Sequence, residues 1–248
     1  MAQLDRSVPI AVFMLLTAAV GASAQDRDSI NWSVTPYIWA SDTSLDLTVR
    51  DSNVGGSVDV PFNDLLDVID TAFQIHLEGG RGQWSAFSDI TIIETSDTRD
   101  RPMVTIDSKS KQTLIDAVVA YWPGGVGSPL NVFGGVRYSA FDERYTFSSE
   151  GNPIAERRSD TDYYDALVGL RYRFDFSERW ALLTRGDLSF GDSEGTALVQ
   201  GLFAYTVGKR RQNRILFGYQ YKTAEFEDGG LTQDFTYQGP MAGFNFRF

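Results

Sequence analysis

The sequence predicts an all-β fold, an antiparallel up-and-down β-barrel of about ten strands with a short helix in its first long loop. Apolar and polar residues alternate with period two in many separate runs. Each run is close to the roughly nine to eleven residues that a tilted membrane-crossing strand needs. Clusters of glycine, asparagine, aspartate or proline separate the runs, as turns separate strands.

Composition narrows the class of protein and of partner. The 248-residue chain is 42% hydrophobic and 13% aromatic, which is too apolar for a disordered chain. Its net charge of −11 disfavours nucleic acid as a partner, because that binding depends on lysine and arginine contacts. The sequence has no cysteine, glycine-rich phosphate loop or metal-spaced cluster, so we expect neither a cofactor nor a metal.

The first 24 residues have the pattern of a signal peptide. Arg6 supplies a small positive region, residues 9–20 are apolar, and Ala22-Ser23-Ala24 matches an A-x-A cleavage site. The alternative is a membrane anchor, for which the segment is short. We therefore expect cleavage after Ala24, export, and a single barrel domain over residues 25–248.

Ten runs are predicted to cross the barrel wall, at residues 32–40, 72–80, 84–95, 111–121, 131–145, 161–174, 180–190, 196–207, 214–223 and 235–248. An even number of strands places both ends of the barrel on one side, the periplasm. The short connections 79–83, 122–130, 175–179 and 208–213 then become periplasmic turns. The connections 41–71, 96–110, 146–160, 191–195 and 224–234 become outer loops. Eight and twelve strands are the alternatives, because boundaries are the weakest part of such a prediction.

Each run has one apolar face and one face that carries charges, which fits either a soluble sandwich or a membrane barrel. Aromatic residues at the run ends, alternating loop lengths and export favour the transmembrane barrel, with charges inside. The predicted lumen charges are Glu78, Asp89, Asp116, Arg137, Asp165, Arg171, Arg173, Arg185, Asp187, Lys222 and Arg247. Because both signs are present, we expect a salt-bridged interior or a narrow water-filled passage.

The first outer loop is predicted to have structure of its own. Alternating residues at 45–49 and 58–60 flank Gly55-Gly56 and predict a hairpin too short to span a bilayer. Helical spacing then predicts about two turns of helix, carried by the apolar residues Phe62, Leu65, Leu66 and Ile69. This helix is either a plug at the barrel mouth or part of an outer loop folded on itself.

The chain ends with Phe244, Phe246 and Phe248 at alternate positions, which resembles the C-terminal signature of bacterial outer-membrane β-barrel proteins. In that family the assembly machinery recognises such an end, so the resemblance implies that machinery as a partner. It also implies location in the cell outer membrane, with membrane lipid and lipopolysaccharide as surroundings.

A second resemblance covers the first third of the chain. The segments 32–39, 62–66 and 79–89 follow one another as in a group of uncharacterised proteobacterial outer-membrane proteins. That group implies the same fold and carries no established activity.

The sequence favours a non-enzymatic role, either structural, in surface interaction, or as a narrow pore for small solutes. The alternative is an outer-membrane hydrolase of lipid or peptide, with His76, the only histidine, as general base. Its nucleophile would come from another strand, such as Ser33, Ser88 or Ser139. Local motifs of barrel hydrolases are not found around His76, so it is at most a candidate catalytic residue.

Overall fold

The computed structural model describes residues 30–49, 55–101, 103–149, 152–208, 212–228 and 231–248. The predicted signal peptide lies outside these described residues. No helix within them is both long and apolar enough to cross a bilayer.

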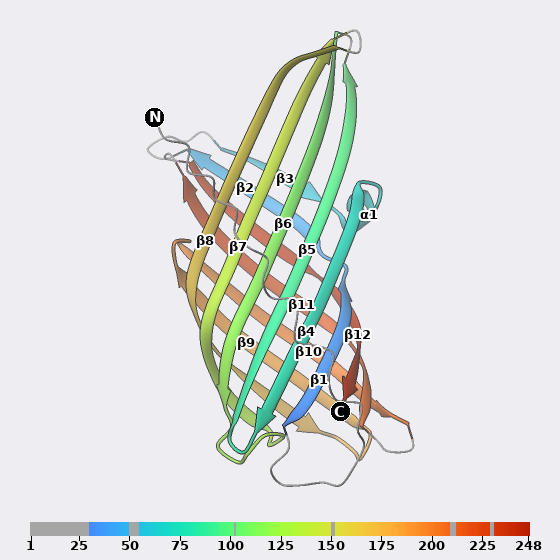
Figure 1. Ribbon diagram of the computed structural model, residues 1–248, viewed down its shortest axis with the longest axis vertical. Coiled ribbons are helices and arrows are strands. Elements are labelled where there is room, and N and C mark those ends of the chain that lie inside the picture. Colours follow the sequence, from blue (N-terminus) through green and yellow to red (C-terminus); the bar gives the residue numbers. More distant parts are fainter. Residues whose placement is uncertain (1–29, 50–54, 102, 150–151, 209–211, 229–230) are drawn as a thin grey trace.

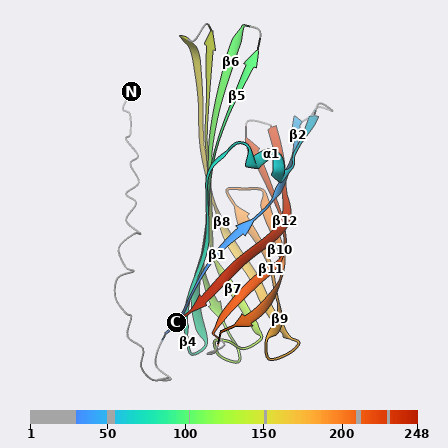
Figure 2. The same ribbon diagram turned by 90° about the vertical axis from the view of Figure 1, so that its right-hand side faces the viewer.

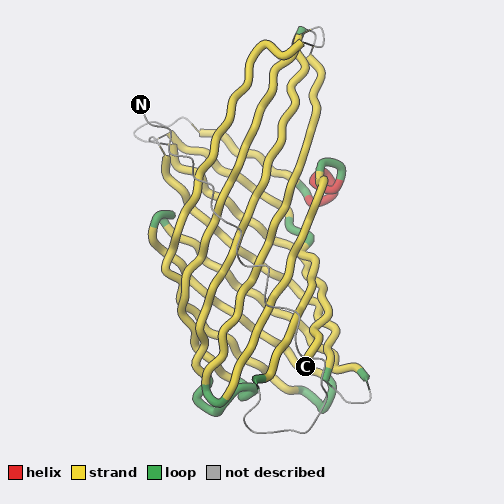
Figure 3. Tube along the Cα trace, viewed as in Figure 1, coloured by secondary structure: helices red, strands yellow, loops and turns green. Residues whose placement is uncertain are grey.

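Strands account for nearly all of the described chain (Figures 1 and 3). The elements are β1 (Asn31–Trp39), β2 (Asp42–Val49), β3 (Gly55–Val60), α1 (Phe62–Leu66), β4 (Ile69–Arg81), β5 (Trp84–Arg101), β6 (Val104–Tyr121), β7 (Leu130–Ser149), β8 (Asn152–Asp175), β9 (Trp180–Gly191), β10 (Gly195–Val207), β11 (Asn213–Asp228) and β12 (Leu231–Arg247).

Ten of these strands form a closed antiparallel barrel. Strands β4 to β12 are neighbours in sequence order, and β1 pairs with both β4 and β12 to close the ring. The predicted ten-stranded barrel is therefore confirmed, and each predicted run lies within one barrel strand or overlaps it closely. The remaining pair, β2 and β3, is the predicted short hairpin; β2 extends the sheet along β12.

Strand β1 pairs with β4 along only part of its length. The pairing ends at Pro36, opposite Ile75, whereas β1 continues along β12 to Trp39. Proline has no backbone N–H to donate to a ladder. Above this point β1 leads into β2, and the upper end of β4 is joined to α1, which precedes it in the chain (Figure 2).

The predicted helix in the first outer loop is confirmed, but it is shorter than expected. It covers Phe62–Leu66, and Ile69 instead begins β4. The Phe62 N–H donates to Asp42 Oδ1 at 2.7 Å, which ties α1 to the start of β2. The helix lies at the rim beside β4 (Figure 1), none of its residues is buried, and Leu66 is 55% exposed.

The outer surface of the barrel carries an apolar band with aromatic residues at its two edges. At the short-turn edge, Trp180 packs on Tyr205 with ring centroids 4.7 Å apart. At the other edge, Tyr138 packs on Tyr164 at 4.9 Å. Phe246 is on the outer face of the closing strand and packs on Phe244, two positions earlier. This arrangement matches the two interfacial girdles of a membrane barrel.

Four neighbouring strands rise far above the rest of the barrel (Figures 1 and 2). Pairing of β8 with β9 ends at Asp165, so residues 152–164 extend beyond β9. Pairing of β5 with β6 continues to Arg101 opposite Val104. We call residues 96–101, 104–110, 142–149 and 152–162 the projecting sheet. The prediction that residues 96–110 and 146–160 are outer loops is therefore wrong, because the described residues of both segments belong almost entirely to strands. These strand segments have polar residues on both faces, since both faces meet water. Alternation of apolar residues therefore does not reveal them.

Candidate functional site

A row of ionisable side chains crosses the inner wall of the barrel. Strand register places His76 opposite Asp89, Asp89 opposite Asp116, Asp116 opposite Arg137, and Arg137 opposite Asp165. Each is on the lumen side because strand side chains alternate and register is fixed by the apolar outer face. These five side chains, which are up to 89 positions apart in the sequence, thus lie side by side in the lumen.

Two arginines and three aspartates form what we call the central network. Arg137 Nε lies 2.8 Å from Asp116 Oδ1, and its Nη2 lies 2.9 Å from Asp187 Oδ1. Arg185 reaches Asp187 at 2.6 Å, Asp116 at 2.9 Å and Asp89 at 2.6 Å. Arg137 is 2% exposed and Asp187 is 4% exposed. Charged hydrogen bonds of this length are the strong kind, and together they satisfy groups whose burial would otherwise be costly.

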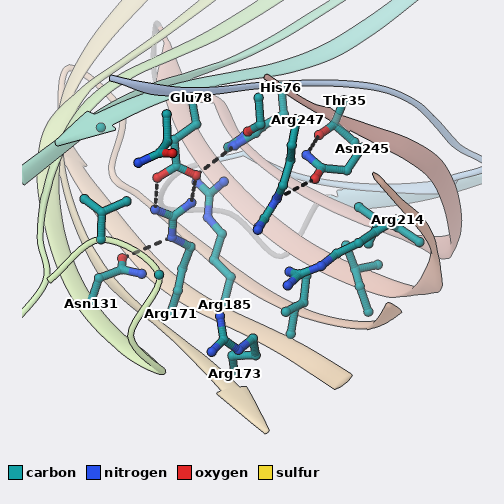
Figure 4. A pocket seen from close by; sticks show the side chains of 18 of the residues that line it. Thr35, His76, Glu78, Asn131, Arg171, Arg173, Arg185, Arg214, Asn245 and Arg247 are labelled. Carbon is teal, nitrogen blue, oxygen red and sulfur yellow. Dashed lines mark hydrogen bonds and ion pairs between the residues drawn. The ribbon is translucent and has the colours of Figure 1, made fainter. Parts of the chain in front are cut away.

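Figure 4 shows a second ion pair in the lumen, between Arg171 and Glu78. Arg171 donates to both carboxylate oxygens of Glu78, at 2.7 and 3.1 Å, and to Asn131 Oδ1 at 3.0 Å. Its guanidinium also lies 4.4 Å from the centre of the Phe87 ring. A bidentate pair stacked on a ring holds the arginine in one orientation.

Apolar side chains fill the lumen around these ion pairs. One buried cluster comprises Phe87, Val118, Ala120, Phe133 and Leu167. On the other side of the central network, aromatic rings meet across the lumen: Phe141, Tyr163, Phe226, Phe235 and Tyr237. The barrel interior is therefore packed through much of its length, as a barrel of few strands allows.

His76 lies between two carboxylates. Its Nδ1 is 2.8 Å from Asp89, and its Nε2 is 3.5 Å from Glu78. A general base needs a free nitrogen lone pair facing its substrate. Within the described chain, neither Ser33 nor Ser139 makes a hydrogen bond with His76. Ser88 lies on the opposite face of its strand from Asp89.

The structure places the other predicted lumen charges on the inner wall as well. Asp165 accepts hydrogen bonds from Ser189 Oγ at 3.1 Å and Ser193 Oγ at 2.6 Å. Lys222 is buried beside the central network. Arg173 and Arg247 lie near the short-turn end. Among the residues that the structure describes, no group of three or more His, Asp or Glu could hold a metal ion.

The lumen contains a cavity of about 470 Å³ at the short-turn end, which we call the vestibule. Its charged lining comprises Arg171, Arg173, Arg185, Arg214, Arg247, His76, Glu78 and Asp89. Residues of the short turns, among them Ser128 and Gln212, line its mouth. The vestibule therefore opens at that end of the barrel, and the central network forms its floor.

The outer face of the projecting sheet and of the strand segments just below it carries exposed ion pairs. Arg158 Nε lies 2.9 Å from Asp160 within the sheet, and Lys111 Nζ lies 2.9 Å from Glu94 at its base. Asp142 is directly opposite Asp160 in the ladder. Partial desolvation and the adjacent Asp160 carboxyl raise the pKa of Asp142. These charges lie above the apolar band, where such groups meet water.

The alternation of β11 also places Arg214 in the lumen, although Arg214 is not among the predicted lumen charges. It shares a face with the buried residues Leu216, Gln220 and Lys222, at even positions of β11. Its place at the very start of its run obscured this signal.

Solved structures with a similar fold are membrane barrels. The outer-membrane protease OmpT from Escherichia coli superposes with a TM-score of 0.54 at 10% identity, over 92% of this chain and 99% of that one. The fold is that of bacterial outer-membrane β-barrel proteins. Ail of Yersinia pestis (TM-score 0.32, 9% identity, 88% and 98% covered) is also similar. So is the translocator domain of NalP from Neisseria meningitidis (0.36, 11%, 90% and 90%). Neither protein-family models nor curated proteins gave a match.

Proposed function

We propose that this chain is a non-enzymatic outer-membrane protein with a closed lumen, which presents the projecting sheet at the cell surface as its interaction surface. The observation that carries the proposal is the contrast between a packed barrel interior and four strands that continue far beyond it. In this orientation the short turns face the periplasm, and the vestibule opens there.

The packed lumen argues against an open pore. A solute passing through would have to separate Arg137 and Arg185 from Asp187 and then cross the aromatic layer. Breaking such buried ion pairs costs several kcal/mol each, on the order of 3–5. We therefore favour the surface role over the narrow pore.

The enzyme alternative has less support. Carboxylates face both ring nitrogens of His76, so neither nitrogen is directed at a substrate as a general base requires. The likeness to a protease is one of fold, which carries no activity by itself. If His76→Ala abolished a hydrolytic activity while the protein stayed folded, the non-enzymatic proposal would be wrong.

Orientation can be tested by labelling, because the chain has no cysteine. Thr98→Cys places a thiol on the projecting sheet, and Gln83→Cys places one in the short turn between β4 and β5. A membrane-impermeant maleimide should label the first in intact cells, and the second only after the outer membrane is permeabilised. Labelling of Gln83→Cys in intact cells, with Thr98→Cys protected, would reverse the proposed orientation.

Closure can be tested in planar bilayers. We expect the purified protein to show no discrete conductance steps. The variant that lacks residues 62–66 should show none either, because α1 lies at the rim. Steps in the full-length protein would support a pore. Steps that appear only after the deletion would establish α1 as a plug.

The surface role predicts that adhesion can be lost while the barrel itself stays folded. Shortening both projecting hairpins, at 97–107 and at 147–156, should leave a barrel that still changes gel mobility on boiling. Cells that express this variant should lose adhesion to cell-coated and abiotic surfaces relative to cells with the full chain. Equal adhesion at equal surface amounts would remove the projecting sheet as the interaction surface.

A further inference from the structure

The vestibule has more positive than negative charge. Five arginine side chains line it, against the carboxylate side chains of Glu78 and Asp89 and the terminal carboxylate of Phe248. Glu78 is held by Arg171 in a bidentate pair, and Asp89 is held by Arg185 at 2.6 Å. The two side-chain carboxylates inside the vestibule are therefore already engaged by two of the five arginines.

The other three arginines have little to neutralise them. Arg173 pairs with Asp175, whose side chain is 53% exposed at the rim. Arg247 donates from Nε to the Asn245 amide oxygen at 3.1 Å, and Glu78, which Arg171 already holds, attracts it without forming an ion pair. Arg214 forms no ion pair within 4.0 Å in the described part of the chain. Arg247 and Arg173 are close enough to repel it, and these repulsions outweigh the attraction of the exposed Asp175 carboxylate.

The fold brings these three guanidinium groups to one space. Arg214 is opposite Asn245 in the ladder between β11 and β12, and Arg247 follows two residues later on the same face. Arg173 comes from β8, three strands away from β11 around the barrel. In Figure 4, Arg214 and Arg247 extend from one wall toward the middle of the cavity, and Arg173 lies across it.

The rest of the lining suits an organic ligand with a charged head. Leu183, Leu202, Met241 and Trp122 give apolar walls, and Gln200 adds an amide. A volume of about 470 Å³ is within the range of small-molecule sites, roughly 300–1,000 Å³. Such sites combine apolar walls with a few placed polar groups.

We propose that the vestibule is a binding site for a phosphate monoester, which enters from the short-turn end. Arg214 and Arg247 bind the phosphate oxygens, and Arg173 supplies the third positive charge. A phosphate monoester carries close to two negative charges and three strong acceptor oxygens. The planar guanidinium fork matches such oxygens in pairs. A monocarboxylate would leave more of the surplus charge without a partner.

The same head group could belong to a free small molecule or to a lipid in the adjacent leaflet. Titration calorimetry on the full chain in detergent distinguishes the two sources. The probes are inorganic phosphate, glycerol 3-phosphate and dioctanoyl phosphatidic acid. Saturable binding of glycerol 3-phosphate supports the site with a free ligand. Saturable binding of the lipid alone supports the site with a lipid ligand.

Variants then test the residues. Arg214→Gln and Arg247→Gln should each weaken binding by about tenfold or more, because each loses charged hydrogen bonds to the anion. Arg158→Gln, which removes an exposed arginine from the projecting sheet, is the matched control and should bind as the parent does. Folding of each variant is verified by its change of gel mobility on boiling. If Arg214→Gln does not fold, Arg214→Lys keeps the charge but loses the fork, and should still weaken binding.

Three results would overturn the proposal. One is the absence of saturable binding for all three probes. Another is equal affinity in the parent and in both glutamine variants. The third is equal affinity for succinate, which would make the site a carboxylate site. None of these outcomes depends on the surface role of the projecting sheet, so the two proposals fail separately.

Discussion

The central network and the vestibule are adjacent parts of one lumen, yet they treat positive charge differently. In the central network, Arg137 and Arg185 share three aspartates and are almost fully buried. In the vestibule, only one of the arginines Arg173, Arg214 and Arg247 forms an ion pair: Arg173 pairs with a carboxylate that is exposed at the rim. The difference teaches that charge count alone does not describe a barrel lumen. Paired charges close it, whereas unpaired charges need water or a ligand.

The physical basis is the cost of desolvation. Taking one ion from water into a protein interior costs several kcal/mol, and only close, well-aligned partners offset that cost. The Asp187 side chain is fully inaccessible to solvent, so it depends on its two arginines, and they depend on it. The vestibule arginines keep contact with a cavity, where hydration supports them.

The largest effect should come from the central network. Asp187→Asn keeps the shape of the side chain but removes a charge shared by Arg137 and Arg185. We expect the free energy of unfolding to fall by about 3–5 kcal/mol, the usual result of leaving a buried charge uncompensated. Urea unfolding in lipid vesicles, followed by tryptophan fluorescence, measures this. Asp160→Asn, on the exposed sheet, is the control, and a loss below about 1 kcal/mol for Asp187→Asn would contradict the comparison.

A smaller effect should come from the packing that supports the network. A Cβ added to Gly169 would lie 2.6 Å from Asp187 Cβ and closer still to the Phe133 ring. Gly169→Ala should therefore destabilise the barrel by about 1–3 kcal/mol through overpacking. Gly201→Ala, which meets no atom within 4 Å, is the matched control in the same unfolding assay. Equal stability of the two variants would mean that the wall beside Asp187 yields easily.

The sequence predicted the barrel better than it predicted the site. Alternation placed the ten strands and the lumen face, because lipid demands apolar residues on every other position. It failed for residues 96–101 and 152–160, where both faces meet water and no apolar period exists. Their positions in the alternating pattern identified Asp116 and Arg185 as side chains that face the lumen, but did not show that they form an ion pair with each other. Their contact spans 69 positions and depends on strand register and barrel diameter, which alternation does not give.

Lys222 sharpens the comparison, because it is a buried amine that borders the central network. Asp116 and Asp187 attract it, whereas Arg137 and Arg185 repel it. Since these influences oppose each other, Lys222→Met should change the free energy of unfolding by only about 1 kcal/mol or less. The same urea assay measures it. A loss of more than about 2 kcal/mol would show that Lys222 belongs to the paired set.

The smallest effect is expected in the vestibule, and its sign should be opposite to that of Asp187→Asn. Arg214→Gln removes a charge that Arg247 and Arg173 repel, so stability should stay level or rise by up to about 0.5 kcal/mol. Because salt screens charges that are in contact with water, the difference between parent and variant should shrink when sodium chloride is raised to about 1 M. Urea unfolding at both salt concentrations measures this. If Arg214→Gln instead lost more than about 1 kcal/mol, Arg214 would be a paired charge, and the distinction between the two parts of the lumen would not hold.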